Sequence, residues 1–158
     1  MRIALALGLL LAVTISPAAV GQIVRIDTCF EEALAALRLS QLEQGIAHCD
    51  RVIDDNSAPA DRRGQAFAQR GLMYARQWSI IGTTGFATQA IADITDSFRL
   101  HTPAVARKHQ LLLVRAQLYA ATGQTRRASV DFTAILNDDP NNAAARSGRD
   151  RLGSPEGL

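Results

Sequence analysis

The sequence has few aromatic residues, a single lysine and only two cysteines. Aromatic residues make up 5% of the chain, and Lys108 is its only lysine. Alanine and leucine are abundant instead, which favours an all-α fold. The formal net charge of +2 comes from 17 basic and 15 acidic residues. Because this near-balance gives no basic surface of the kind that binds nucleic acid, no nucleic-acid partner is predicted.

A recognisable catalytic or cofactor-binding motif is also missing. The sequence has no glycine-rich phosphate loop, and His48, His101 and His109 lie far apart without metal-ligand spacing. His48 and Cys49 are neighbours on a predicted helix, so their side chains diverge by about 100° and do not form a nucleophile pair. We therefore expect a protein that is not an enzyme and that carries no cofactor or metal.

Residues 1–21 have the pattern of a signal peptide. Arg2 precedes an uncharged apolar run over residues 3–15, which is too short to span a bilayer as a helix. Small residues follow, and cleavage can fall after Ala18 or after Gly21. No cysteine ends the apolar run, so a lipid anchor is not expected. The mature chain is predicted to be exported, periplasmic or secreted, without a stable membrane anchor.

The clearest unit after this leader spans residues 108–141. Two segments repeat one apolar spacing, the first at Leu112, Ala116 and Tyr119 and the second at Ala128, Phe132 and Ile135. This spacing predicts two helices, each with one apolar face. Gly123 marks the turn between them, and Pro140 ends the second helix because it lacks an amide donor. Two such short helices need neighbouring copies to bury their apolar faces.

The unit resembles a tetratricopeptide repeat. The six positions that match the pattern of that family are Leu112, Ala116, Tyr119, Ala128, Phe132 and Pro140. The departures are Leu112 for the usual Trp, Arg115 for Leu and Ala116 for Gly. The resemblance implies an all-α, right-handed stack of about three antiparallel helical hairpins. It also implies that the first helices of successive hairpins line a concave binding surface.

Two further copies precede this unit. A weaker copy covers residues 26–58, with Cys29 and Ala33 on its first helix and Gly45 and Cys49 on its second. Another copy covers residues 65–103. A closing helix is expected at 142–152, capped by Asn141 or Asn142, and a flexible tail at 153–158. The helical domain is thus predicted to span residues 22–152.

The middle copy carries an insertion. Gly71 and Ala90 are 19 residues apart, whereas the equivalent Ala116 and Ala128 are 12 apart, so seven residues are added. Either each helix is about one turn longer, or residues 79–85 form a projecting loop. The apolar residues around this point form either a contact patch for a partner or a cover over neighbouring helix ends; they are Trp78, Ile80, Ile81 and Phe86.

The two cysteines are predicted to meet across the first hairpin. If Ala33 faces Gly45 in an antiparallel pair, Cys29 faces Cys49. Two facing cysteines in an exported chain favour a disulfide. The alternative is a pair of buried free thiols that act as small apolar residues.

The predicted function is that of a non-catalytic interaction module. By the resemblance, a protein or peptide segment would bind the concave face, at positions that include Leu72, Leu113 and Gln117. Arg38 and Arg76 are the candidate anchors for a carboxylate, although both could instead be solvated arginines. The alternative function is a self-assembling envelope protein that forms a homo-oligomer through the insertion at Trp78–Phe86.

Overall fold

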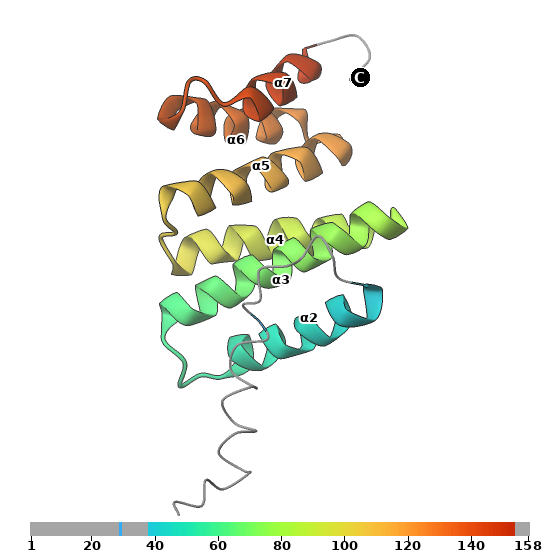
Figure 1. The fold of residues 1–158 in the computed structure, drawn as a ribbon, viewed down its shortest axis with the longest axis vertical. Helices are drawn as coiled ribbons and strands as arrows, with labels where there is room; N and C mark the ends of the chain where they lie inside the picture. Colours follow the sequence, from blue (N-terminus) through green and yellow to red (C-terminus); the bar gives the residue numbers. More distant parts are fainter. Residues whose placement is uncertain (1–28, 30–37, 154–158) are drawn as a thin grey trace, which may run out of the picture.

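The computed structural model describes residue 29 and residues 38–153, and the regular structure in this part of the chain is helical (Figure 1). The predicted signal peptide, the first predicted helix apart from Cys29 and most of the predicted tail lie outside the described residues. The helices are α2 (Leu39–Asp54), α3 (Ala60–Ile81), α4 (Thr84–Leu100), α5 (Val105–Ala121), α6 (Thr125–Asp138) and α7 (Ala143–Leu152).

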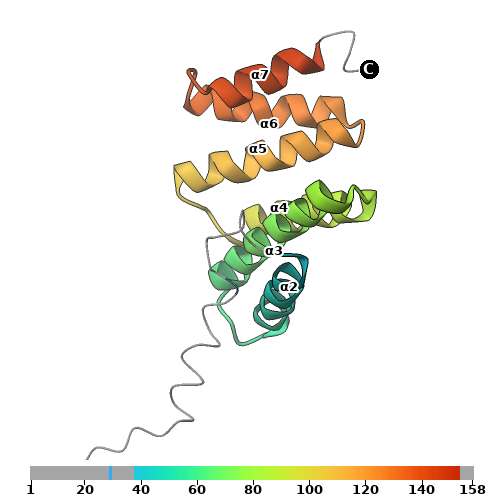
Figure 2. The ribbon, with the colours of Figure 1, turned by 45° about the vertical axis from the view of Figure 1, so that its right-hand side comes forward.

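Helices that follow one another in sequence pack against each other. The pairs α3–α4 and α5–α6 form two hairpins, α2 packs against α3, and α7 packs against α6. Figures 1 and 2 show these elements stacked along the long axis of the molecule. Helix α5 also contacts both α3 and α7, so α3, α5 and α7 form one row, called here the inner row. The prediction of an all-α stack of helical hairpins is therefore confirmed.

Hairpin α3–α4 shows how the insertion is accommodated. Helix α3 continues to Ile81 and α4 begins at Thr84, so the insertion lengthens the two helices and is not a projecting loop. Gly82 ends α3 with a φ of 77°, a left-handed conformation that glycine adopts without a steric cost. Helix α3 also begins earlier than the predicted repeat. Pro59 precedes its first residue, and Asp61 lies in the first turn, where the helix dipole favours an anion.

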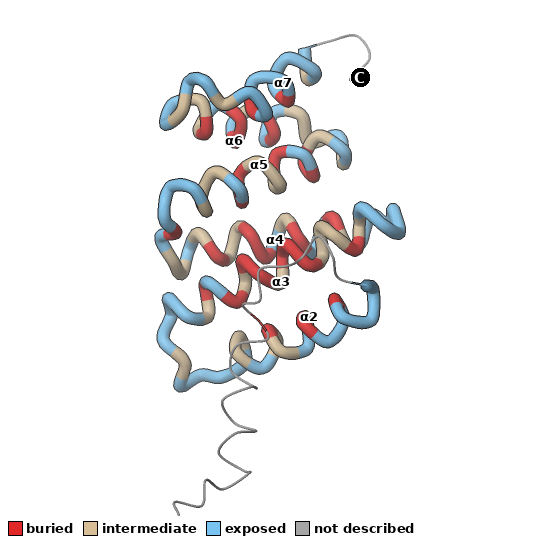
Figure 3. The backbone as a smooth tube through the Cα atoms, in the orientation of Figure 1, coloured by how far each residue is buried: buried red, intermediate tan, exposed pale blue. Residues whose placement is uncertain are grey.

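Small residues sit where paired helices cross. A Cβ atom added at Gly71 would lie 3.0 Å from Ile94 Cγ1 and 3.2 Å from the carbonyl oxygen of Ala90. In the next hairpin Ala116 and Ala128 are fully buried at the equivalent places, beside buried Phe132. Figure 3 shows the buried residues concentrated on helix faces turned toward neighbours. Because the side chains at these crossings are small, the helices approach closely and the larger side chains around each crossing interlock.

An arginine bridge lies beside each crossing. Arg115 Nε and Nη2 each donate to a carboxylate oxygen of Asp131 at 2.8 Å, and Nη1 donates to Thr95 Oγ1 on α4 at 3.1 Å. The same guanidinium lies over the rings of Phe98 and Tyr119. Asp131 is almost fully buried. Through these bonds Arg115 joins α5 both to α6 and to the preceding hairpin.

The preceding hairpin repeats the bridge. Arg70 makes two 2.8 Å bonds to Asp93 on α4 and a 2.6 Å bond to Asp50 on α2. The bonds to Asp93 raise the pKa of Arg70 above its ordinary value. Arg70 and Asp93 are 23 residues apart, whereas Arg115 and Asp131 are 16 apart, and the difference is the seven-residue insertion. The bridge is thus a shared feature of two equivalent hairpins.

The C-terminal helix closes the stack. Asn142 caps α7, since its side-chain oxygen accepts a bond from the Ala145 amide at 3.1 Å, as one of the two predicted caps would. Gly148 allows α7 to lie against α6, because a Cβ atom there would fall 2.4 Å from the Phe132 ring. Helix α7 therefore covers the apolar face of the last hairpin.

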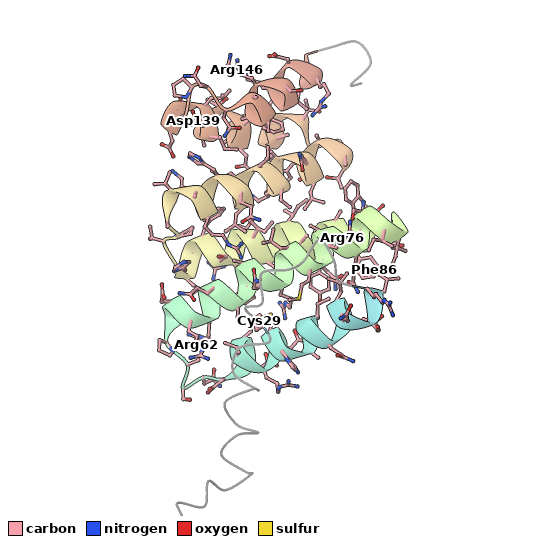
Figure 4. All side chains as sticks on the ribbon, viewed as in Figure 1. Cys29, Arg62, Arg76, Phe86, Asp139 and Arg146 are labelled. Carbon is pink, nitrogen blue, oxygen red and sulfur yellow. A yellow bond between two sulfur atoms is a disulfide. The ribbon has the colours of Figure 1, made fainter. Side chains whose placement is uncertain are left out.

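The predicted pairing of the cysteines is confirmed. Cys29 and Cys49 form a disulfide, and both are buried in a cluster with Leu42, Ala66 and Met73 (Figure 4). The bridge joins residues 20 apart and fixes Cys29 against α2 and its contacts with α3. It therefore holds Cys29 to the first layer of the stack.

Loss of the disulfide is expected to lower the unfolding free energy by about 3 kcal/mol. Without the bridge, a loop of this size is open in the unfolded chain, and the unfolded state gains conformational entropy. Urea unfolding of the oxidised protein and of the variant Cys29→Ser with Cys49→Ser measures the difference. Addition of reductant should lower the stability of the wild type and leave that of the double variant unchanged. Equal stability of the oxidised wild type and the double variant would contradict a structural role for the bridge.

Arg115→Met is expected to cost about 3 kcal/mol of unfolding free energy, because it leaves Asp131 buried without its partner. Adding Asp131→Leu should restore most of this loss, since no buried charge remains. Arg126→Met is the matched control on the exposed surface of α6 and should change stability by less than about 0.5 kcal/mol. Urea unfolding of the three variants tests the bridge, and an equal loss for both single variants would exclude it.

Candidate functional site

The inner row bounds a hollow of about 330 Å³ between α3 and α5, called here the α3–α5 hollow. It lies toward the C-terminal ends of these two helices, which point the same way in Figure 1. Its walls are mainly apolar, although four of its nine lining residues have polar side chains. The lining residues from α3 are Leu72, Ala75, Arg76, Trp78 and Ser79, and those from α5 are Gln110, Val114, Gln117 and Leu118.

A second hollow of about 270 Å³ continues along the same row. This α5–α7 hollow is lined by Gln117 and Ala120 on α5, by Phe132 on α6, and by residues of α7. Gln117 lines both hollows, so they meet at its side chain. The two hollows together cross all three helices of the inner row.

Arginine supplies the charge of both hollows. Arg76 lines the first and Arg151 lines the second, and the described lining of neither hollow includes an Asp or Glu. Arg76 Nη1 lies 3.5 Å from Ser79 Oγ, one turn further along α3. Figure 4 labels Arg76 on the part of α3 nearest the tip of its hairpin. The surface is therefore suited to apolar groups and carboxylates.

Another hollow lies at the opposite end of the groove between α3 and α5, and its polar groups bond to one another or to nearby residues of the chain. It measures about 360 Å³ and contains Gln69, His101 and Arg107. Arg107 donates to Gln69 and to Gln110, while His101 contacts Asp61. The walls of this hollow are more polar than those of the α3–α5 hollow, so it is less suited to apolar groups.

The structure brings together three of the five residues predicted to bind a partner. Leu72, Arg76 and Gln117 all line the α3–α5 hollow. Leu113 instead packs against the cluster around Phe132. Arg38 is exposed at the start of α2, where its amide donates to Gln41 Oε1, and it takes no part in the described lining of either hollow.

Sequence reasoning missed two features of this surface. Trp78 lines the α3–α5 hollow, although the sequence placed it only in the insertion. Arg151 lines the α5–α7 hollow, although the closing helix carried no predicted site residue. Continuing the inner-row positions from α5 into α7 could have identified Arg151, but α7 is too short and degenerate to align securely with the earlier repeats.

The four apolar residues of the insertion do not form one exposed patch. Trp78 is half-buried against the cluster of Ala87, Ala90 and Leu118. Phe86 is half-buried too, and its ring stacks on Tyr74 with 6.3 Å between centroids. Ile80 and Ile81 are exposed, at 45% and 49%. The predicted patch is therefore divided between residues that pack on their own chain and two isoleucines at the tip.

Two of the three histidines contact aspartates on other helices. His101 contacts Asp61, and His109 Nε2 lies 3.2 Å from Asp138. Within the described residues no three or more His, Cys, Asp or Glu side chains gather in a way that could hold a metal ion.

The fold and site thus define a class: a stack of helical hairpins with a hollowed row of inner helices. No family model, no curated protein and no solved structure matches the chain. In the described part of the chain, no helix has the length and apolar character needed to cross a membrane.

Asp138 ties the start of α5 to the end of α6, and this contact should depend on pH. Hydrogen bonds from Lys108 and His109 lower the pKa of Asp138 below its ordinary value. A lowered pKa in the folded state adds stability above the unfolded-state pKa of about 4, and this stability is lost as the pH falls through the folded-state pKa.

Asp138→Asn should therefore lower the unfolding free energy slightly at neutral pH and at low salt, because the contact is exposed and screened by ions. The difference from wild type should shrink as the pH falls below about 4. Chemical unfolding across this pH range measures it. A difference that is constant down to the most acidic pH would show that the ionised carboxylate is not responsible.

Proposed function

We propose that this protein is a non-catalytic interaction module that holds a peptide or protein segment along the inner row. The observation that carries the proposal is the pair of hollows that meet at Gln117, with apolar walls and an arginine in each. Such a surface suits a segment with apolar side chains and at least one carboxylate. Arg76 is the proposed anchor, since it lies beside Leu72 and Trp78 in the larger of the two.

The resemblance to tetratricopeptide repeats supports the same proposal. The matching residues Ala116, Tyr119, Ala128 and Phe132 are buried together between α5 and α6. In that family the first helices of successive hairpins form the binding surface, and the inner row is composed of the equivalent helices. We propose in addition that the protein works outside the cytoplasm, because of its leader-like N-terminal sequence and its disulfide.

Site-specific photocrosslinking tests the binding surface. A photoreactive amino acid at Gln117 should capture a discrete partner in the cells that make the protein, because Gln117 lies where the hollows meet. The same amino acid at Val130, which is exposed on α6, is the matched control and should not capture that partner. Arg76→Ala with Leu72→Asp should abolish the crosslink from Gln117, since it removes the anchor and places a charge in the apolar wall.

Equal capture from Gln117 and Val130, or capture unaffected by the Arg76 and Leu72 changes, would reject the inner row as the binding surface.

The alternative function, self-assembly through the insertion, rests on exposed Ile80 and Ile81. A sedimentation coefficient that rises with protein concentration, and no longer does so in Ile80→Asp with Ile81→Asp, would favour it.

A further inference from the structure

The tip of hairpin α3–α4 belongs to a long uncharged stretch. Arg76 and Asp93 enclose sixteen residues, 77–92, none of which is charged, although 20% of the whole chain is Asp, Glu, Lys or Arg. This stretch contains the last turn of α3, the turn at Gly82 and the first half of α4. In Figure 1 the joined ends of α3 and α4 reach farther to the right than the C-terminal end of α5 does. The most protruding part of the hairpin is therefore also uncharged.

The side chains of the tip are ordered by polarity along α3. Ile80 and Ile81 are at the extremity, exposed at 45% and 49%. Trp78 lies about 4.5 Å behind Ile81 along the helix axis, and Arg76 lies about 7.5 Å behind it, at 1.5 Å per residue. From the extremity inward, the order is thus aliphatic, aromatic, cationic.

This order matches the layers at the surface of a phospholipid bilayer. Aliphatic side chains enter the acyl region, tryptophan prefers the interface, and arginine reaches the phosphate groups. Interfacial elements bury their apolar side chains about 5–10 Å deep, which corresponds to the distance between Ile81 and Arg76. On the returning helix the first acidic residue is Asp93, about 13 Å from Thr84 along the axis, so α4 brings no acidic side chain into the bilayer with the tip.

A protein surface fits the tip less well. A stable interface buries about 800 Å² on each partner. The exposed apolar surface of the tip comes from two half-exposed isoleucines, because Trp78 and Phe86 pack largely on their own chain. Two such side chains fall well short of a dimer interface, whereas shallow and reversible insertion into a bilayer needs only a few apolar side chains.

We propose that the α3–α4 tip inserts reversibly into the interfacial layer of a phospholipid membrane. Ile80 and Ile81 enter the acyl region, while the accessible parts of Trp78 and Arg76, at the α3–α5 hollow just behind the tip, face the headgroup layer and its phosphates. This inference does not rest on the proposed peptide-binding function, although both use Arg76 and Trp78. It describes a peripheral contact by a hairpin tip, which needs neither a spanning helix nor a covalent anchor.

The protein contains its own reporter for this contact, because Trp78 is its single tryptophan. On addition of vesicles of phosphatidylethanolamine and phosphatidylglycerol, Trp78 emission should shift to shorter wavelength. Acyl chains brominated near the headgroup should quench it. The apolar leader sequence could also reach a lipid surface, but its insertion alone would not bring Trp78 into contact with the brominated chains.

Vesicle co-sedimentation of variants completes the test. Ile80→Asp with Ile81→Asp should weaken binding about tenfold or more and abolish the quenching. Val130→Asp, on α6, replaces another exposed apolar residue and should leave both unchanged. Far-ultraviolet circular dichroism checks that each variant folds, and quenching in the wild type tests the tip even if a variant does not.

Three results would overturn the proposal. The first is wild-type Trp78 emission that is unaffected by vesicles. The second is equal loss of binding in the tip and Val130 variants, or no loss in either. The third is a lipid-independent dimer that depends on Ile80 and Ile81 and does not bind vesicles, which would assign the tip to a second copy of the chain.

Discussion

Close approach of paired helices at small residues is the constraint on which the rest of this structure depends. At Gly71 and Ala90, and again at Ala116 and Ala128, the two helices of a hairpin leave no room for larger side chains. Close approach lets Ile94 and Phe132 fill the space beside each crossing. It also brings the arginine that precedes each small residue within bonding distance of an aspartate on the opposite helix.

The arginine bridges turn separate hairpins into one stack. Each guanidinium bonds an aspartate of its own hairpin and also a side chain of the preceding layer, Asp50 for Arg70 and Thr95 for Arg115. A buried carboxylate is costly without a partner, so each bridge favours one register of the two helices and of the neighbouring layer. The position of each helix in the inner row follows from this arrangement, and the two hollows lie between neighbouring helices of the row.

The insertion shows how a repeat can gain a feature without losing its core. Lengthening both helices by about one turn keeps the crossing and its arginine bridge intact, since the added residues lie beyond Gly71 and before Ala90. Trp78 packs on Ala87 and Ala90 and Phe86 stacks on Tyr74, whereas Ile80 and Ile81 stay exposed at the extremity. The extension also places Trp78 beside Arg76 in the wall of the α3–α5 hollow.

The sequence by itself determined the hairpins α3–α4 and α5–α6, the small residues at their crossings, the cap at Asn142 and the pairing of Cys29 with Cys49. These features follow from local rules of periodicity, turn chemistry and antiparallel register, which act over one or two helices. It also indicated Leu72, Arg76 and Gln117 as positions on a shared face. Only the tertiary structure decided that the insertion extends both helices and that Trp78 turns inward while Ile80 stays exposed. Only the tertiary structure showed that Arg115 bonds to Asp131 and that Arg151 lines the α5–α7 hollow. These outcomes depend on how the layers pack against each other. The apolar spacing along one helix does not specify which of its side chains the next layer covers.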